Sequence, residues 1–401
     1  MATKKLKVVN VPNLRFMEFE GEWKKKKLGD LGDFVGGGTP TSSNLNFWSG
    51  NIPWVSSSDL VENNIYTLRI TRFITQDAID NSATKFCVAP VILIVSRVGV
   101  GKVAYSTESL CTSQDFTNVI NMQCNGLFLC YFLSVEMLKE VAKTQGTSIK
   151  GISTSDIKCK QLFVPKDEEQ QKIASFLTLI DKRISTQRKI IEQLETLSKG
   201  LREKLFSQQL RFKDDNGKNF VKWETKKLRE VCEINPKSGN LPSSFIYIDL
   251  ESVVDGMLLK EERIEKQEAP SRAQRILRKG DVLFQMVRPY QKNNFYFQRE
   301  GDYVASTGYA QIRTTNNSQF IFQYLHYQKF VDEVIEKCTG TSYPAISSTD
   351  LSNIFIEIPS VAEQTKIANF LSVIDKKTDA EKLLLEQIEM QKRFLLQNLF
   401  I

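Results

Sequence analysis

The sequence predicts two globular α/β (α+β) domains separated by two long, antiparallel coiled-coil helices. Three observations carry this prediction: a length of 401 residues, an internal duplication at a constant offset, and a heptad pattern inside the duplicated segment. A chain of this length exceeds one ordinary domain of about 100 to 200 residues. With 41% hydrophobic and 25% charged residues, the chain is apolar enough to form real cores.

The internal duplication is the strongest of these observations. Residues 169 to 206 align without a gap with residues 363 to 400, so that EQQKIASFLTLIDKR matches EQTKIANFLSVIDKK. The offset is constant (367 − 173 = 194), and it also aligns GTSIKGISTSDI at 146 to 157 with GTSYPAISSTDL at 340 to 351. Solenoid repeats span about 20 to 50 residues, so this longer repeat indicates a duplicated domain plus helix.

Each repeat has a recognisable beginning and end. A strap stands near the start of each copy. In the first copy Arg15 and Phe16 precede EWKKKKL at 22 to 28, and in the second Arg211 and Phe212 precede KWETKKL at 222 to 228. Each copy ends in Leu-Phe. The ending at Phe206 leads directly into the second strap. The ending at Phe400 can lead only, in space, towards the first strap. We therefore expect a pseudo-twofold, circular arrangement in which the two helices run antiparallel.

The repeated segments carry a heptad seam. From Ile173 to Leu205, mostly Ile and Leu step alternately by four and three, which predicts long paired helices of roughly 57 Å at 1.5 Å per residue. A single amphipathic helix usually packs on its own domain, but length, phase and duplication favour mutual pairing here. We expect this pairing to be local and imperfect, because polar residues interrupt the seam at Gln187, Ser198, Thr378, Glu381 and Lys392.

These boundaries divide the chain into four segments. We predict a first globular domain at 1–165, a first helix at 166–210, a second globular domain at 211–359 and a second helix at 360–401.

The two globular parts show the same order of elements. A β-prone run at 91 to 95 is followed by a helical pattern at 128 to 142. In the second copy, strand-like runs at 282 to 287 and 294 to 297 precede a helical pattern at 320 to 336. We expect a shared architecture with different surfaces, because the copies diverge strongly between their matching ends.

Composition restricts the class of protein less than the duplication does. Lys and Arg exceed Asp and Glu by 54 − 47 = 7, a mild excess that suits a polyanionic partner without requiring one. The seven cysteines are odd in number, lack C-x-x-C spacing and follow no signal peptide, which indicates free, mostly buried thiols in the cytoplasm. No stretch reaches the roughly 18 apolar residues of a membrane span.

No catalytic or metal centre can be assembled from the motifs. SRVGVGK at 96 to 102 lacks the first glycine and the hydroxyl residue of a P-loop. GGG at 36 to 38 lacks the spacing of a dinucleotide site and is interpreted as a flexible loop. His326 is the only histidine, too little for a His-based triad or a multi-histidine metal site. We expect no catalytic residue, metal or cofactor.

Basic residues interleaved with small polar and aromatic ones recur in both globular parts, a mixture that suits phosphates and base edges. Any one of them can be an ordinary solvated charge, and the Gly-Thr-Ser loops can serve turn geometry instead. The candidate DNA-binding residues are Ser57, Arg69, Arg72, Arg97, Lys102, Thr147, Ser148, Lys150, Arg272, Arg275, Arg288, Tyr290, Lys292, Thr341 and Ser342.

The repeated segments VPKDEEQQKIASFLTLIDKRI and IPSVAEQTKIANFLSVIDKKT resemble the conserved helices of type I restriction-modification specificity subunits. IPWVSSSDL at 52 to 60 and SRVGVGKVAY at 96 to 105 resemble blocks of their first recognition domain, whereas DVLFQMVRPY at 281 to 290 departs from the S-R-x-G pattern. The resemblance covers nearly the whole chain.

The resemblance implies that each domain reads one half of a split target in double-stranded DNA, while the helices set the gap. It implies two methyltransferase subunits as partners, which supply S-adenosylmethionine binding and adenine methylation, and restriction (motor) subunits that join through them. Two alternatives remain open from the sequence. One is a freestanding two-headed DNA-binding protein, and the other is a self-contained methyltransferase or nuclease.

Overall fold

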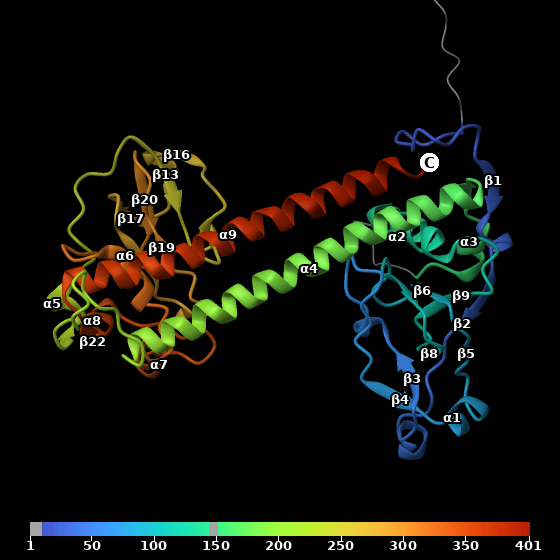
Figure 1. The fold of residues 1–401 in the computed structure, drawn as a ribbon, viewed down its shortest axis with the longest axis horizontal. Coiled ribbons are helices and arrows are strands. Elements are labelled where there is room, and N and C mark those ends of the chain that lie inside the picture. The colour runs from blue at the N-terminus through green and yellow to red at the C-terminus, as the bar shows by residue number, and fades with distance from the viewer. Residues whose placement is uncertain (1–9, 144–150) are drawn as a thin grey trace, which may run out of the picture. The chain divides into compact units, whose positions relative to one another are not determined.

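The computed structural model describes residues 10–143 and 151–401, and the chain divides into two compact units. Unit 1 comprises Met1–Arg188 and Leu384–Ile401, and unit 2 comprises Lys189–Leu383. The long helices α4 (Asp167–Phe206) and α9 (Val361–Asn398) each contribute one segment to either unit (Figure 1). Within the described ranges, no helix is long and apolar enough to cross a membrane. All seven cysteines are free, as predicted.

Unit 1 contains two four-stranded sheets. The first is antiparallel, in the order β2 (Asp33–Gly36), β9 (Phe116–Ile120), β6 (Val91–Val95) and β7 (Val103–Ser106). The second has the order β4 (Arg72–Ile74), β3 (Ile52–Val55), β8 (Leu110–Thr112) and β5 (Phe86–Cys87), and its central pair β3–β8 is parallel. The strap forms β1 (Lys24–Lys27), which pairs with β10 (Gln161–Val164). The helices are α1 (Gln76–Asp80), α2 (Gly126–Lys143) and α3 (Thr154–Cys159).

Unit 2 repeats this topology. Its antiparallel sheet has the order β12 (Glu233–Ile234), β21 (Tyr309–Arg313), β18 (Val282–Gln285) and β19 (Phe295–Tyr296). The second sheet is β16 (Arg263–Glu265), β13 (Ser244–Ile248), β20 (Tyr303–Ser306) and β17 (Ala273–Ile276), again with a parallel central pair. Two further pairs are β11 (Glu224–Lys227) with β22 (Phe355–Ile358) and β14 (Val253–Val254) with β15 (Met257–Leu258). The short helices are α5 (Leu228–Val231), α6 (Ser318–Tyr324), α7 (Gln328–Glu336) and α8 (Ser348–Ser352).

The shared order of strands confirms the predicted common architecture. The run predicted at 91 to 95 is β6, and every residue of this central strand is buried, as a continuous apolar run requires. The run predicted at 282 to 287 is β18, which ends two residues earlier at Gln285. The sequence between the matching ends has diverged, but the central strands β6 and β18 of the antiparallel sheets are buried along their whole length in both units.

The helix predicted at 320 to 336 is broken, so that prediction is wrong in detail. α6 ends at Tyr324 and α7 starts at Gln328, because Tyr327 takes an extended conformation with ψ 129°. The carboxylate of Glu203 on α4 accepts a hydrogen bond from the backbone N–H of Gln328 at 3.0 Å and so caps the new helix. Phe206 packs between Tyr324 and Tyr327, with ring centroids at 5.0 and 5.6 Å, and occupies the break.

The GGG segment is not a flexible loop, contrary to the prediction. A Cβ at Gly37 would lie 2.0 Å from the carbonyl oxygen of Ser113, so the backbones cross too closely for any side chain. The carbonyl of Gly38 accepts hydrogen bonds from the Trp54 indole N–H at 3.0 Å and the Thr84 hydroxyl at 2.9 Å. These glycines hold the first sheet close to the second.

The strap ties the start of each long helix to its unit. In unit 1, Arg15 binds the Glu169 carboxylate through two hydrogen bonds of 2.8 Å, and the Trp23 indole N–H donates to it at 3.2 Å. Glu169 is only 2% exposed, so this pairing is what allows a charge to be buried there. The same contacts recur in unit 2, made by Arg211, Trp223 and Glu363.

The Leu-Phe endings close each unit. Leu399 and Phe400 enter the core of unit 1, where Phe400 contacts Phe128 at a centroid distance of 5.3 Å. The backbone N–H of Leu14 donates to the carbonyl of Asn398 at 2.9 Å, next to the first strap. The C-terminal end of α9 therefore lies against the first strap, which was predicted from the repeat boundaries.

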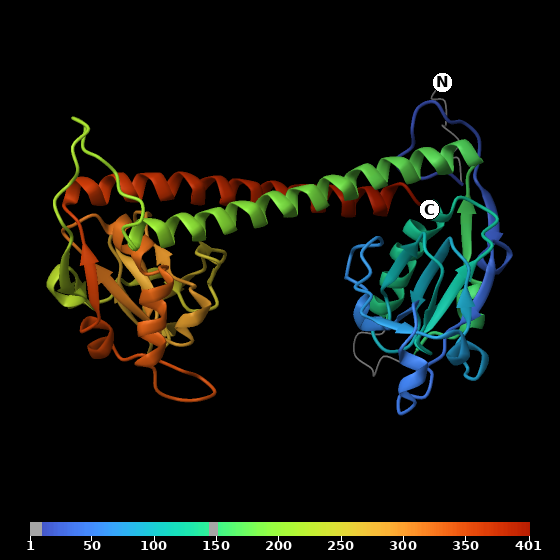
Figure 2. The same ribbon diagram turned by 60° about the horizontal axis from the view of Figure 1, so that its bottom comes forward.

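The heptad seam is buried along both helices. In α4 every seam position from Ile173 to Leu205 is buried or half-buried. The polar interruptions are inside the seam as well, with Gln187, Ser198, Thr378 and Lys392 each at most 8% exposed. Within each unit, the segment of α4 lies along the segment of α9 (Figures 1 and 2). The two segments run antiparallel there, as the contacts described below require.

Candidate nucleic-acid interface

Four of the predicted residues gather around one short segment of unit 1, residues 56 to 60. Ser57 begins the turn η3 (Ser57–Asp59). Arg69 donates its backbone N–H to the carbonyl of Asp59 at 2.8 Å, and the Lys102 ammonium donates to the carbonyl of Leu60 at 3.3 Å. The fourth residue, Arg72, enters from β4. The structure thus brings together side chains that are up to 45 positions apart in the sequence (102 − 57 = 45).

Arg72 is committed to contacts inside unit 1. Its guanidinium forms an ion pair of 2.9 Å with Asp59, contacts the hydroxyl of Ser56, and lies 4.5 Å from the centroid of the Trp54 ring. Asp59 also accepts from the backbone N–H of Ser56 at 2.7 Å. Arg72 therefore fixes the segment that carries Ser57, whereas the exposed Arg69 keeps its charge at the surface.

Arg97 stands apart from this group, on the loop after β6. It is exposed, and with Val98, Gly99, Gly151, Ile152 and Ser153 it lines an open depression of about 670 Å³. The loop is anchored from behind, because the backbone N–H of Ile152 donates to the carbonyl of Ser96 at 2.7 Å. Thr147, Ser148 and Lys150, also predicted, lie outside the described residues.

The corresponding loop of unit 2 follows β18 and is built differently. Arg288 has a left-handed backbone (φ 53°), and its guanidinium lies 4.2 Å from the centroid of the Tyr343 ring. Its backbone N–H donates to the carbonyl of Pro344 at 2.7 Å. The exposed loop with Thr341 and Ser342 therefore lies beside Arg288, because a β-bridge between Thr339 and Ala345 closes it.

Tyr290 and Lys292 belong to the same loop. Tyr290 is 49% exposed. Lys292 also has a left-handed backbone, and its ammonium donates to the side-chain carbonyl of Gln328 at 2.9 Å. Burial, together with the nearby charges of Lys199 and Arg202, lowers the pKa of Lys292. The charges of Lys199 and Arg202 on α4 therefore lie close enough to Lys292 to affect its pKa, and the carboxylates of Glu203 and Asp332 act in the opposite direction.

The last two predicted residues lie on the other sheet. Arg275 is on β17, its Nε is buried without a hydrogen-bond partner among the described residues, and burial lowers its pKa. Arg272 precedes β17 and is exposed, and its carbonyl accepts from the backbone N–H of Thr307 at 2.9 Å. The predicted residues of unit 2 therefore form two groups and not one.

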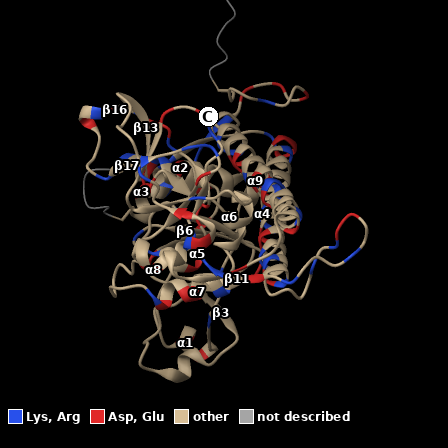
Figure 3. Ribbon diagram, turned by 90° about the vertical axis from the view of Figure 1, so that its left-hand side faces the viewer, with Lys and Arg blue, Asp and Glu red and all other residues tan. Residues whose placement is uncertain are grey.

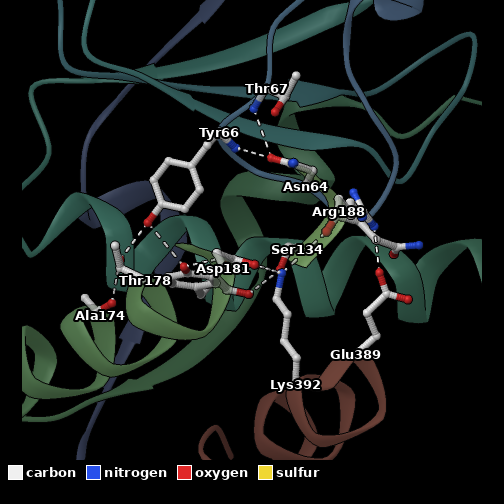
Figure 4. Close-up of polar contacts among 12 residues, drawn as sticks. Asn64, Tyr66, Thr67, Ser134, Ala174, Thr178, Asp181, Arg188, Glu389 and Lys392 are labelled. Atoms are coloured by element: carbon white, nitrogen blue, oxygen red, sulfur yellow. Dashed lines mark hydrogen bonds and ion pairs between the residues drawn. The ribbon is translucent and has the colours of Figure 1, made fainter. Parts of the chain in front are cut away.

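A buried ion pair joins α4 and α9 inside unit 1. The Lys392 ammonium lies 2.5 Å from the Asp181 carboxylate, and both side chains are at most 11% exposed (Figure 4). The Tyr131 hydroxyl donates to Asp181 at 2.7 Å. Burial and the Asp181 charge raise the pKa of Tyr131. Lys392 also donates to the carbonyl of Asn63 at 3.4 Å, which ties α9 to a loop of the globular part of unit 1.

Figure 4 shows how this loop is held. The hydroxyl of Tyr66 lies 2.6 Å from that of Thr178 on α4 and 3.2 Å from that of Tyr131. The side chain of Asn64 accepts from the backbone N–H groups of Tyr66 and Thr67. Residues 63 to 67 therefore contact both long helices.

The equivalent contact between α4 and α9 in unit 2, which we call a helix crossing as in unit 1, is made mainly by hydrogen bonds from neutral side chains. Asp375, 194 positions after Asp181 (375 − 181 = 194), accepts from the Gln323 amide at 2.6 Å and the Ser198 hydroxyl at 3.1 Å. Arg202 lies 3.6 Å away, and burial lowers its pKa. A second pair of crossings is ionic in both units, Arg188 with Glu389 and Lys382 with Glu195. Figure 3 shows acidic and basic residues interspersed along α4 and α9.

The surface of each helix start carries the same apolar patch. Apolar patch 1 consists of Phe16, Phe176 and Leu179, of which Leu179 is 63% exposed. Apolar patch 2 consists of Phe212, Phe370 and Val373, of which Val373 is 66% exposed. The aromatic pair lies at a centroid distance of 5.6 Å in both. The same kind of exposed apolar patch is therefore present at the same repeat position in both units.

Sequence reasoning missed several residues of these clusters. Trp54 and Asp59, which hold Arg72, lay in a quoted motif but carry no positive charge. Tyr343, which stacks on Arg288, follows a loop interpreted as turn geometry. A search for aromatic residues next to basic ones in the folded chain, and not in the sequence, would have found Trp54 and Tyr343.

A family profile described as "Type I restriction modification DNA specificity domain" matches residues 20–196 and again residues 221–390. The chain belongs to this family. It is similar to the type I restriction enzyme MjaIX specificity subunit of Methanocaldococcus jannaschii, with 26% identity over 369 residues, 84% of this chain and 83% of the relative. The MjaVIII specificity subunit of the same organism is 23% identical and covers 97% of this chain and 95% of its own length.

Two solved structures share the fold. The S subunit of a type I restriction-modification system from M. genitalium covers 98% of this chain and 99% of its own, with a TM-score of 0.60 and 19% identity. A chain from a structural study of complex assembly and conformational transition of the type I restriction-modification system covers 94% and 96%, with a TM-score of 0.55 and 17% identity. The family match identifies this chain as the DNA specificity subunit of such a system and not as one of its catalytic subunits.

Proposed function

We propose that each unit of this specificity subunit reads one half of a split target in double-stranded DNA. The observation that carries the proposal is the combination of one topology, present twice, with two different sets of side chains on the loops after β6 and β18. Two copies of one fold with different surfaces suit two different half-sites. The segments 1–165 and 211–359 would be the recognition domains, and 166–210 and 360–401 the spacer helices.

The candidate residues would divide the work of recognition. Exposed or weakly committed cations, such as Arg69, Arg97 and Lys292, suit phosphates, which fix register and orientation. The helices would set the distance between half-sites at about one DNA turn, near 34 to 36 Å between centres. Binding should then fall steeply with added salt, because each neutralised phosphate releases counterions.

We also propose that apolar patches 1 and 2 bind two copies of one methyltransferase subunit. Exposed cations flank each patch at the same repeat positions, Lys182 and Arg183 in one and Lys376 and Lys377 in the other. The methyltransferase subunits would supply S-adenosylmethionine binding and adenine methylation, and restriction subunits would join through them. This chain itself would need no cofactor.

The docking proposal is tested by placing a charge on each patch. Leu179→Glu and Val373→Glu should each reduce the bound methyltransferase from two copies per chain to one, and the double variant should bind none. Leu197→Glu is a matched control, because Leu197 is 49% exposed on α4 but its repeat equivalent is Gln391. Mass measurement of the purified complex gives the answer. Equal loss with the control would refute the assignment.

The reading of a split target is tested by expressing the chain with its methyltransferase and mapping methylated adenines in the host genome. The proposal requires methylation within one bipartite motif. A freestanding DNA-binding protein would bind DNA without co-purifying methyltransferase, and a self-contained enzyme would methylate or cleave DNA when incubated alone with S-adenosylmethionine or magnesium.

A further inference from the structure

The loop after β18 holds an arginine whose backbone is anchored but whose Nε–H has no hydrogen-bond partner in the part of the chain that the structure describes. Arg288 is anchored through its backbone N–H to Pro344, and a β-bridge joins Val287 to Ala345. Pro289, the next residue, is buried and fixes its own φ. The backbone of Arg288 therefore has little freedom in its left-handed conformation.

The guanidinium plane is held by an aromatic ring. It lies 4.2 Å from the centroid of Tyr343, which is 65% exposed, so the stack is at the surface. Among the described residues, no carboxylate forms an ion pair with Arg288, and its Nε has no hydrogen-bond partner. By contrast, Arg313 in the same unit binds Asp281 through two bonds of 2.7 Å. Such a two-bond pairing with a carboxylate is typical of an arginine whose role is to stabilise the fold.

Further unpaired polar atoms lie at the two ends of this loop, on Gln285 at the end of β18 and on Asn294 just before β19. Gln285 is 4% exposed and Asn294 is 1% exposed, yet Oε1 of the first and Nδ2 of the second have no partner among the described residues. The remaining amide atoms are engaged, because Gln285 Nε2 donates to the carbonyl of Val287 at 2.7 Å and Asn294 Oδ1 accepts from the backbone N–H of Gln285 at 3.0 Å. Buried polar groups are normally paired, so unpaired ones concentrated here point to a ligand with its own donors and acceptors.

We propose that Arg288, oriented by Tyr343, reads a guanine in the half-site of unit 2. This inference rests on the proposed function. Arginine is the side chain whose planar fork matches the O6 and N7 acceptors of guanine in the major groove, and a stacked ring keeps that plane in position. A contact to a DNA phosphate needs a positive charge close to the phosphate, but it does not need a guanidinium plane held in one orientation. Lys292, four residues on, supplies such a charge.

The test uses the complex with its methyltransferase and DNA in which the half-site of unit 2 is randomised. Arg288→Lys keeps the charge but not the fork. It should lose preference at one G·C pair, where wild type discriminates by about 5- to 150-fold, the equivalent of roughly 1 to 3 kcal/mol. Tyr343→Leu should weaken that preference in part, and Tyr343→Phe should retain it, because the ring and not the hydroxyl holds the plane.

Arg299→Ala is the matched control, since Arg299 pairs with Glu261 on the same unit. Its preferences should equal those of wild type. Retention of full discrimination by Arg288→Lys would overturn the inference. So would a uniform loss of affinity in Arg288→Ala with a salt slope lower by about one, which indicates a phosphate. If instead the wild-type complex reads no bipartite target, the proposed function fails and not this residue alone.

Discussion

The loops after β6 and β18 follow equivalent strands of the same sheet, yet their arginines are held in opposite ways. Arg97 is exposed beside two glycines and an open depression, whereas Arg288 is anchored by Pro289 and stacked on Tyr343. A glycine-rich loop can adapt to a ligand. A clamped arginine is already oriented and loses less freedom on binding.

The frame behind these loops is the same in both units. The buried glutamate at each helix start binds an arginine and a tryptophan of the strap, and a second buried residue, Gln170 or Gln364, accepts from the backbone N–H of an asparagine. The contacts at the two helix starts, which form the frame, are therefore the same in both units, whereas the loops after β6 and β18 differ. A change in the support should affect stability equally in both units, and a change in a loop should affect one half-site.

The largest expected effect is loss of the helix-start carboxylate. Glu169→Ala and Glu363→Ala should each lower the free energy of unfolding by about 4 kcal/mol, because a partly buried arginine is left without its partner. Chemical unfolding followed by tryptophan fluorescence measures this, since Trp23 and Trp223 report on the two sites. Glu168→Ala, at the exposed neighbour, should cost less than about 0.5 kcal/mol. A large difference between the two copies would show that the frame is not constant.

The next effect distinguishes the units at the helix crossing. Lys392→Met should cost about 3 kcal/mol, because Asp181 remains buried without its cation. Ser198→Ala, the repeat-equivalent position (392 − 198 = 194), should cost only about 1 kcal/mol, since Arg202 and Gln323 still serve Asp375. Thermal unfolding of both variants measures the contrast. Equal costs would mean that the crossings do not differ energetically.

The sequence predicted correctly those elements that depend on neighbouring residues or on the internal repeat. The heptad spacing from Ile173 to Leu205 and the apolar run at 91 to 95 depend on neighbours in the chain, so periodicity predicted α4 and β6. The break after Tyr324 did not follow from periodicity, because Glu203 and Phe206, more than a hundred residues earlier, create it.

The candidate site was predicted only in part for the same reason. Basic residues could be found from composition, but whether each is free depends on distant partners. Arg72 is held by Trp54 and Asp59, and Arg288 by Tyr343, which is 55 positions away (343 − 288 = 55). Which arginines contact DNA, and whether the domain boundaries at 165 and 359 are functional ones, stay predictions.

The free energy of unfolding should depend on pH in unit 2 in a way that it does not in unit 1, because unit 2 contains the buried His326. Burial and the charge of Arg202 lower the pKa of His326 to about 4, with Lys292 also lowering it and Asp375 raising it. The unfolded chain takes up a proton below about pH 6.5 and the folded chain does not, so stability is lost as the pH falls. In this helix the repeat offset is 192, because Asn125 and Phe128 occupy the places of Asn317 and Phe320, so His326 corresponds to Ser134 of unit 1 (326 − 192 = 134). His326→Ser introduces that residue. It should remove about 2 kcal/mol of the stability difference between pH 7 and pH 5. Unfolding at both pH values checks this, and an unchanged difference would contradict the buried position of His326.

The smallest expected effect concerns Arg97. Because no ring holds its plane among the described residues, Arg97→Lys should change DNA affinity less than about 2-fold, and Arg97→Ala should cost about 1 kcal/mol. Binding titrations at several salt concentrations measure both. A loss of base discrimination in Arg97→Lys as large as that expected for Arg288→Lys would remove the contrast between the two loops.

The most direct test of two readers held apart by helices is the gap in the methylated target. One heptad inserted into each helix, after Arg188 and after Lys382, keeps the seam in phase and adds about 10 Å, or roughly three base pairs. Mapping of methylated adenines should then show both half-sites unchanged and the gap longer by about three base pairs. An unchanged gap, with methylation intact, would contradict the account.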